Sequence, residues 1–283
     1  MKTGDGAWHD RMYNNRELVP AHPAHLARWA DESAKARRDG PCELDIAYGD
    51  GAGETLDVFP APHRDAPVLV FIHGGYWRAL DKKDQSFVGP AFARDGACVV
   101  IPNYALCPAV TVPHIVLQVA RAVAWTWHHI DRFGGDPRRI VVAGHSAGGH
   151  LAAMMLSCLW PQLDPALPKD VVRSALAVSG LHDLDPIRRT PFLQTDLRLT
   201  PRQVAQASPA RLPAPRQGTL YAVAGADESE EYHRQNRLIQ ESWGARRVPV
   251  CELLPGLNHF SILEALVAPN HRLHQLAVDL LRV

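Results

Sequence analysis

The sequence predicts an α/β protein with a mostly parallel central sheet and helices on both faces. From residue 67 onward, short uninterrupted apolar runs alternate with segments that repeat apolar residues at helical spacing. Runs of about five Val, Ile and Leu residues are typical of strands buried on both faces of a parallel sheet. Alternation of strand and helix indicates βαβ units. Upstream, two runs with apolar residues at every second position flank a glycine-rich break at residues 49–53, which predicts an antiparallel hairpin.

The expected elements follow one another in a simple order. The first forty residues contain a polar lead-in and then one helix, at roughly residues 24–38. The hairpin strands cover the runs at 44–48 and 56–58. A long amphipathic helix is expected at 112–130, and a second, less regular one at 232–243. The buried strands are expected at residues 68–72, 97–101, 140–143, 175–178, 220–224 and 248–254.

Prolines set residues 181–218 apart from the rest of the chain. Proline has no backbone N–H and does not fit inside a core strand or one long helix. We therefore expect this segment to leave the edge of the sheet and form a small cap above the site. No internal repeat and no second domain boundary is evident, so residues 1–283 are expected to form a single α/β domain that carries this excursion.

Composition disfavours several classes of partner. Thirty basic and thirty acidic residues give a formal net charge of zero, so nothing electrostatic favours nucleic acid or an anionic membrane. No window has the apolar length of a membrane span, and residues 1–11 lack a secretory apolar stretch.

The five cysteines form no C-x-x-C pair, which favours buried thiols in a reducing compartment. We expect a cytoplasmic protein; the oligomeric state stays open, with a homodimer as one option.

The strongest chemical signal is the segment 144–148, GHSAG, between the expected strand 140–143 and a helical pattern. In this context G-x-S-x-G is the nucleophile elbow of the α/β-hydrolase fold. The serine must sit on a strained turn so that its hydroxyl projects above the sheet, and the glycines prevent clashes of the neighbouring backbone. Ser146 is thus the predicted nucleophile. The N–H of Ala147, at the start of the helix, is predicted to point at developing negative charge.

A second signal, HGGYW at residues 73–77, directly follows another expected strand. The fold needs an oxyanion donor from the loop after its third strand, and H-G-G is a known form of that loop. Gly74 and Gly75 are therefore predicted to donate N–H groups together with Ala147.

Aromatic residues close to this loop are predicted to shape the substrate pocket. Tyr76 and Trp77 directly follow the two glycines, and Tyr104 is a further candidate. The alternative, that an aromatic residue after a strand only packs against the core, stays open at this point.

A catalytic triad needs an acid and a histidine in the chain order Ser…Asp/Glu…His. Asp227 and His259 each lie on a loop at the carboxyl end of an expected strand, where an open α/β sheet places its site. They are the predicted acid and base. Glu228 and Asp183 remain competing acids.

No metal and no cofactor is expected. Four histidines lie in helical patterns without an H-E-x-x-H frame, namely His128, His129, His271 and His274. The glycines around Ser146 do not fit the dinucleotide motif G-x-G-x-x-G, because Ser146 stands where a glycine is needed. The expected partner is a small-molecule substrate.

The segment 73–77 resembles the H-G-G-x-W motif of kynurenine formamidase (arylformamidase). That family belongs among the α/β hydrolases related to hormone-sensitive-lipase-like esterases, and it hydrolyses N-formylkynurenine. The similarity runs from about Tyr13 to Phe260, and Trp77 is its more specific mark, since many esterases share the elbow. The resemblance implies a metal-free hydrolase whose triad is Ser146, Asp227 and His259. Further similar stretches lie at residues 103–108, 133–137, 144–151 and 227–236.

The residues and the resemblance together predict a serine hydrolase that cleaves a small amide or ester through an acyl-enzyme. An arylformamidase acting on a substrate such as N-formylkynurenine is one reading. A carboxylesterase or carbamate hydrolase acting on small aryl or alkyl esters is the alternative. A non-catalytic binding protein on the same fold is disfavoured, because every member of the triad has a candidate.

Overall fold

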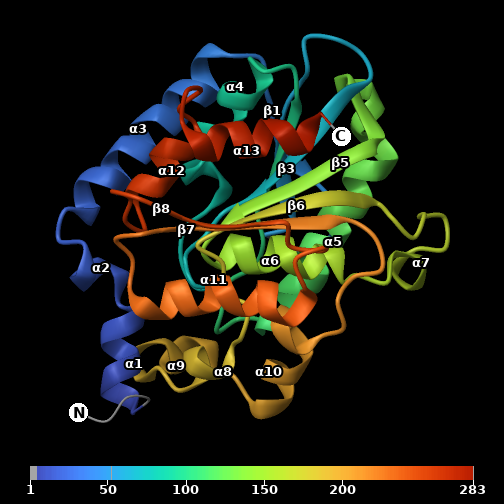
Figure 1. Ribbon diagram of the computed structural model, residues 1–283. Helices are drawn as coiled ribbons and strands as arrows, with labels where there is room; N and C mark the ends of the chain where they lie inside the picture. The colour runs from blue at the N-terminus through green and yellow to red at the C-terminus, as the bar shows by residue number, and fades with distance from the viewer. Residues whose placement is uncertain (1–4, 52, 283) are drawn as a thin grey trace.

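Eight strands form one sheet in the computed structural model, which describes residues 5–51 and 53–282 (Figure 1). Their order across the sheet is β1-β2-β4-β3-β5-β6-β7-β8. The first two strands form the predicted antiparallel hairpin, and β2 also pairs antiparallel with β4. All other neighbours are parallel. The strands are β1 (Glu43–Ala47), β2 (Thr55–Phe59), β3 (Ala66–Ile72), β4 (Cys98–Pro102), β5 (Gly135–His145), β6 (Val172–Val178), β7 (Thr219–Gly225) and β8 (Val250–Leu254).

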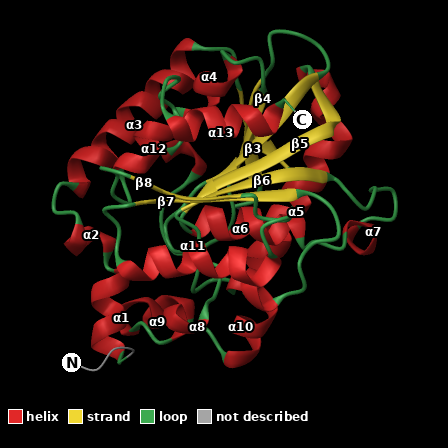
Figure 2. Cartoon of the chain, viewed as in Figure 1, coloured by secondary structure: helices red, strands yellow, loops and turns green. Residues whose placement is uncertain are grey.

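Helices cover both faces of this sheet, as the sequence predicts (Figure 2). The two faces bury separate apolar cores. In β3, the side chains of Val68 and Val70 enter one core, whereas those of Leu69 and Phe71 enter the other. This alternation explains why the strand sequences are continuously apolar.

The helices of the two faces come from different parts of the chain. One face carries α3 (His22–Asp39), α4 (Val88–Ala93), α12 (Ser261–Leu266) and α13 (Arg272–Leu281). The other face carries α5 (Val112–His129), α6 (Ala147–Leu156) and α11 (Glu230–Trp243). The remaining short helices are α1 (Gly6–Tyr13), α2 (Asn15–Leu18), η1 (Lys82–Asp84), η2 (Ile130–Phe133), α7 (Trp160–Leu163), α8 (Asp185–Arg188), α9 (Pro191–Leu197), α10 (Pro201–Ala207) and η3 (Pro209–Arg211).

The proline-rich excursion is built from α8, α9, α10 and η3, between β6 and β7. Each of these helices has a proline in its first turn. Proline suits that position because its fixed φ matches the helix and its missing N–H would have no partner there. The excursion is packed against the body of the protein: Ile187, Leu193 and Val204 are buried in the same core as α5 and α6.

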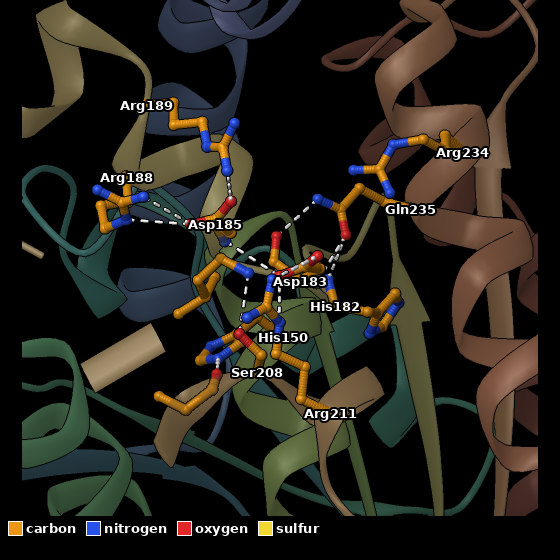
Figure 3. Close-up of polar contacts among 12 residues, drawn as sticks. His150, His182, Asp183, Asp185, Arg188, Arg189, Ser208, Arg211, Arg234 and Gln235 are labelled. Carbon is orange, nitrogen blue, oxygen red and sulfur yellow. Dashed lines mark hydrogen bonds and ion pairs between the residues drawn. The ribbon is translucent and has the colours of Figure 1, made fainter. Parts of the chain in front are cut away.

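Buried polar groups anchor the start of the excursion to α11 (Figure 3). The side-chain oxygen of Gln235 accepts hydrogen bonds from the backbone N–H groups of His182 and Asp183, both at 2.8 Å. Its amide nitrogen donates to the carbonyl of Asp183, also at 2.8 Å. One glutamine side chain therefore satisfies three backbone groups of the segment that leaves β6.

Two histidines are completely buried beneath this excursion. His150 in α6 donates from Nε2 to the carbonyl of Ala207, at 2.6 Å. Both ring nitrogens of His182 lack a hydrogen-bond partner among the described residues. Burial lowers the pKa of His150 to about 4, and burial with a smaller contribution from His150 lowers the pKa of His182 to about 3. Both rings are therefore neutral in the folded protein near pH 7.

Acid should destabilise the protein through these two rings. An unfolded histidine titrates near pH 6.5, whereas the folded rings resist protonation until much lower pH. The stability that they contribute is thus complete above about pH 6.5 and is lost as pH falls towards their folded pKa values, at up to about 1.4 kcal/mol per pH unit for each ring. Urea unfolding between pH 7 and 4.5 should show this decline. His182→Leu should reduce the slope, because it replaces an unpartnered buried ring by an apolar side chain. Replacement of the exposed His63 by Asn is the matched control. The prediction would be contradicted if the free energy of unfolding fell as steeply with decreasing pH in His182→Leu as in this control.

Candidate active site

A cavity of about 440 Å³ lies where the parallel strands end, and it brings together Ser146 and His259. Ser146 directly follows β5, and His259 lies on the loop after β8. The carboxyl ends of parallel strands are where an α/β sheet places its ligand site. Gly75, Tyr76 and Asn15 also line this cavity.

Ser146 occupies the sharp turn that the G-x-S-x-G motif predicts. Its backbone has φ 57° and ψ −117°, a conformation that side-chain-bearing residues rarely adopt. The turn is held in place by a hydrogen bond from its N–H to the carbonyl of Val178 in β6, at 2.8 Å. A Cβ atom on Gly148 would lie 2.0 Å from the carbonyl oxygen of Ile72, so this position excludes every other residue. The motif is therefore required by the close approach of β3, β5 and α6.

His259 is held from three sides. Its Nδ1 lies 2.6 Å from Oε2 of Glu228. Its backbone carbonyl accepts a hydrogen bond from Nε2 of His145, at 2.9 Å. Its ring packs between the rings of His145 and Tyr232, each with a centroid distance of 4.6 Å. With Nδ1 bonded to a carboxylate, Nε2 is left to face the cavity.

The structure corrects the predicted partner of His259: the carboxylate belongs to Glu228 and not to Asp227. The Glu228 side chain is fully buried, and its other oxygen accepts hydrogen bonds from the Ser179 hydroxyl, at 2.6 Å, and from the Gly225 N–H, at 2.7 Å. The side chain of Asp227 is exposed, because the turn after β7 directs it outward. The other competing acid, Asp183, pairs with Arg211 instead.

The glycine loop after β3 lies against the nucleophile, as expected from its sequence. A Cβ atom on Gly74 would lie 3.3 Å from the Cβ of Ser146. Gly75 has φ +106°, and a Cβ there would lie 2.0 Å from the carbonyl oxygen of Ala79. Ala147 is buried at the first position of α6. Gly74 and Ala147 therefore lie directly beside Ser146, and Gly75 lines the same cavity.

Of the three aromatic residues predicted to shape the pocket, only Tyr76 lines the cavity. Trp77 is completely buried, with its ring edge-on to His150 at a centroid distance of 5.0 Å. Tyr104 stacks on His73 at 4.2 Å and donates its hydroxyl to the His73 carbonyl at 2.9 Å. Tyr104 therefore holds the glycine loop through its carbonyl groups, whereas Trp77 belongs to the core and not to the cavity wall.

A cluster of polar side chains also borders the site, and sequence reasoning missed all of its members except Tyr76. Tyr232 in α11 and Tyr76 have their hydroxyl oxygens 2.6 Å apart. The amide nitrogen of Asn15 lies 2.8 Å from the Tyr232 hydroxyl. The Tyr76 hydroxyl donates to the carbonyl of Tyr13, at 2.8 Å. These contacts join segments more than sixty residues apart, and no local motif marks any of them.

The wall of the cavity combines aromatic side chains, among them Trp29, Phe192 and Phe260, with the charged side chains of Arg16, Arg78 and Asp196. Across residues 5–51 and 53–282, no group of three or more His, Cys, Asp or Glu side chains is arranged to hold a metal ion. None of the helices in those ranges combines the length and the apolar character that a bilayer crossing requires.

Comparison with known proteins agrees with this geometry. The BD-FAE family model matches residues 56–167, which include the glycine loop and the elbow. Kynurenine formamidase of Danio rerio is 30% identical over 266 residues, covering 91% of this chain and 88% of the relative.

Solved structures share the fold over almost the whole chain. A protein of Silicibacter sp. TM1040, provisionally named a thioesterase, superposes with a TM-score of 0.83 at 28% identity, covering 97% of this chain and 98% of the other. An esterase of Pyrobaculum calidifontis has the same fold, with a TM-score of 0.73 at 18% identity over 94% and 93% of the two chains. The protein is a hydrolase of the esterase or kynurenine formamidase type, and its chain belongs to the kynurenine formamidase family of α/β hydrolases.

Proposed function

We propose that the protein is a serine hydrolase that cleaves small amides, formamides of aryl amines first among them, with Ser146, His259 and Glu228 as its triad. The observation that carries this proposal is the fully buried Glu228–His259 pair beside the strained turn of Ser146. A buried carboxylate bonded to Nδ1 holds the imidazole in the tautomer that leaves Nε2 free to accept a proton.

The mechanism follows from these positions. Nε2 of His259 removes the proton from the Ser146 hydroxyl as its oxygen attacks the substrate carbonyl. The N–H groups of Gly74, Gly75 and Ala147 receive the negative charge that develops on the carbonyl oxygen. His259 then passes the proton to the leaving nitrogen or oxygen, and a water molecule, activated by the same imidazole, releases the acyl group from Ser146.

The preference for a small acyl group and an aryl leaving group is supported by the shape of the site. The nucleophile lines the cavity with only 2% of its own surface exposed, which favours a small acyl group at the point of attack. The aromatic side chains in the cavity wall suit a flat leaving group. The relative in Danio rerio is named a kynurenine formamidase.

Hydrolysis of small aryl or alkyl esters is a second candidate function, supported by the esterase of Pyrobaculum calidifontis that shares the fold. Esters are more reactive than amides, so an amidase site also cleaves activated esters. The decision therefore needs kcat/KM values for both kinds of substrate on one preparation.

Removal of the nucleophile should abolish turnover without unfolding the protein. We expect Ser146→Ala to lower kcat by about 10⁴- to 10⁶-fold, the usual cost of losing a triad nucleophile. The circular dichroism spectrum and Tm should stay close to those of the native protein. A fluorophosphonate probe should label Ser146 alone, and mass spectrometry of its peptides checks this. A label on another serine would refute the assignment.

Substitutions of the two adjacent acids, Asp227 and Glu228, should have very different effects on activity. Glu228→Gln removes the charge that orients His259, and we expect kcat/KM to fall by about 10³- to 10⁴-fold, as for the acid of other triads. Asp227→Asn is the matched control; its side chain is exposed, and activity should change by less than about twofold. A larger loss of kcat/KM in Asp227→Asn than in Glu228→Gln would mean that Asp227 is the acid of the triad.

A substrate panel tests the proposed class. We expect kcat/KM for N-formylkynurenine to exceed that for N-acetylated and carbamate analogues of the same aryl amine, because the longer acyl groups do not fit beside the buried nucleophile. A preference for the larger acyl groups would refute the proposed formamide selectivity.

A further inference from the structure

We propose that Asn15 is a specificity-determining residue, whose side-chain oxygen accepts a hydrogen bond from the N–H of an amide leaving group. This inference rests on the serine-hydrolase function proposed above. In this proposal, a residue of the N-terminal segment distinguishes amide substrates from ester substrates.

Asn15 is placed correctly for this task. It is the first residue of α2, its surface is 7% exposed, and it lines the same cavity as Ser146 and His259. Its amide nitrogen lies 2.8 Å from the hydroxyl oxygen of Tyr232 and 3.3 Å from that of Tyr76.

The directions of the hydrogen bonds fix the orientation of the Asn15 amide. The carbonyl of Tyr13 can only accept, so the single hydroxyl proton of Tyr76 is committed to it. The 2.6 Å contact between the two tyrosine hydroxyls must then use the proton of Tyr232. Both hydroxyl oxygens are therefore acceptors towards Asn15, which must present its NH₂ group to them.

The side-chain oxygen of Asn15 is consequently left without a protein donor. No hydrogen bond joins it to any other described residue, and it is not one of the buried atoms that lack a partner. Because Asn15 borders the cavity, this oxygen is an acceptor available to a bound molecule.

Tyr232 connects this acceptor to the reacting groups. Its ring packs on the ring of His259 with a centroid distance of 4.6 Å. Burial is the main influence on the pKa of Tyr232 and raises it, while hydrogen bonding with Tyr76, Asn15 and Ser146 acts in the opposite direction. The Tyr232 hydroxyl thus lies near both Asn15 and Ser146, and its ring lies against the proposed base.

The chemistry of the leaving group explains the selectivity. When an amide is cleaved, the nitrogen lone pair turns towards His259 to receive the proton, and the N–H bond points elsewhere. An acceptor at that place stabilises the transition state for the amide. An ester oxygen has no hydrogen there and would set its own lone pairs against those of Asn15. A site built to bond an N–H rejects the analogue that lacks it far more strongly than a purely apolar site does.

The ratio of two kcat/KM values tests the proposal. Formanilide and phenyl formate differ only in the N–H or O that joins the aryl and formyl groups. Asn15→Leu keeps the volume of the side chain and removes the acceptor. We expect the formanilide/phenyl formate ratio to fall by about 10- to 100-fold, the effect of one hydrogen bond made in the transition state. Because both substrates are measured on one preparation, the ratio does not depend on the fraction of folded protein.

Two further variants separate specificity from structure. Tyr232→Phe keeps the ring against His259 but removes the hydroxyl that orients Asn15, so the ratio should fall in the same direction. Glu17→Gln changes an exposed side chain of the same helix that does not line the cavity, and should leave the ratio unchanged. An unaltered ratio in Asn15→Leu, or an equal fall in Glu17→Gln, would overturn the proposal.

The result also distinguishes this inference from the function on which it rests. Suppose that phenyl formate hydrolysis depends on Ser146, but the native protein does not hydrolyse formanilide or the ratio does not change in Asn15→Leu. That result refutes the role of Asn15 and leaves the serine mechanism standing. Hydrolysis of both substrates that persists in Ser146→Ala refutes the proposed serine mechanism.

Discussion

The carboxylate of Glu228 is completely buried, and the arrangement of the site depends on how this charge is satisfied. An isolated charge in the protein interior would be very costly, so every lone pair of the carboxylate needs a donor. The donors are the Ser179 hydroxyl just after β6, the Gly225 N–H at the end of β7 and the His259 imidazole after β8. One carboxylate thereby joins the ends of three neighbouring parallel strands and sets the orientation of the proposed base. Loss of any of these partners would leave charge unpaired as well as disturb the imidazole.

The strained turn at Ser146 is the second constraint, and it is sustained by packing. The unfavourable backbone conformation persists because β5 before it and α6 after it are both fixed in the core. The glycines are then obligatory, since Gly74 and Gly148 lie where backbone carbonyls of the facing segments leave no room for a side chain. The residues proposed to stabilise the oxyanion and the proposed nucleophile are thus placed by one close approach of three backbone segments, and the hydroxyl of the buried Tyr104 holds the start of the glycine loop through the His73 carbonyl.

The N-terminal segment completes the cavity from a distance in sequence. Tyr13 donates its hydroxyl to Glu231 at 2.6 Å, and Ser229 donates to the carbonyl of Met12 at 2.6 Å, so that α1 is tied to α11. These contacts bring Asn15 to the wall of the cavity that Ser146 and His259 also line. In the proposed function, the strand ends supply the chemistry that all such hydrolases share, whereas this segment supplies the discrimination between substrates.

The sequence by itself determined the features that arise from local patterns: the parallel strands, the hairpin, the elbow at Ser146 and the glycine loop. Each depends on neighbouring residues, because apolar runs form buried strands and glycine alone fits a crowded backbone. Tertiary structure decided the features that depend on side-chain direction. Asp227 and Glu228 are adjacent carboxylates after the same strand, and only the turn that follows β7 decides which of them is buried against His259. The place of Asn15 was decided in the same way, since its hydrogen-bond partner Tyr232 lies 217 residues along the chain and no local pattern records that contact.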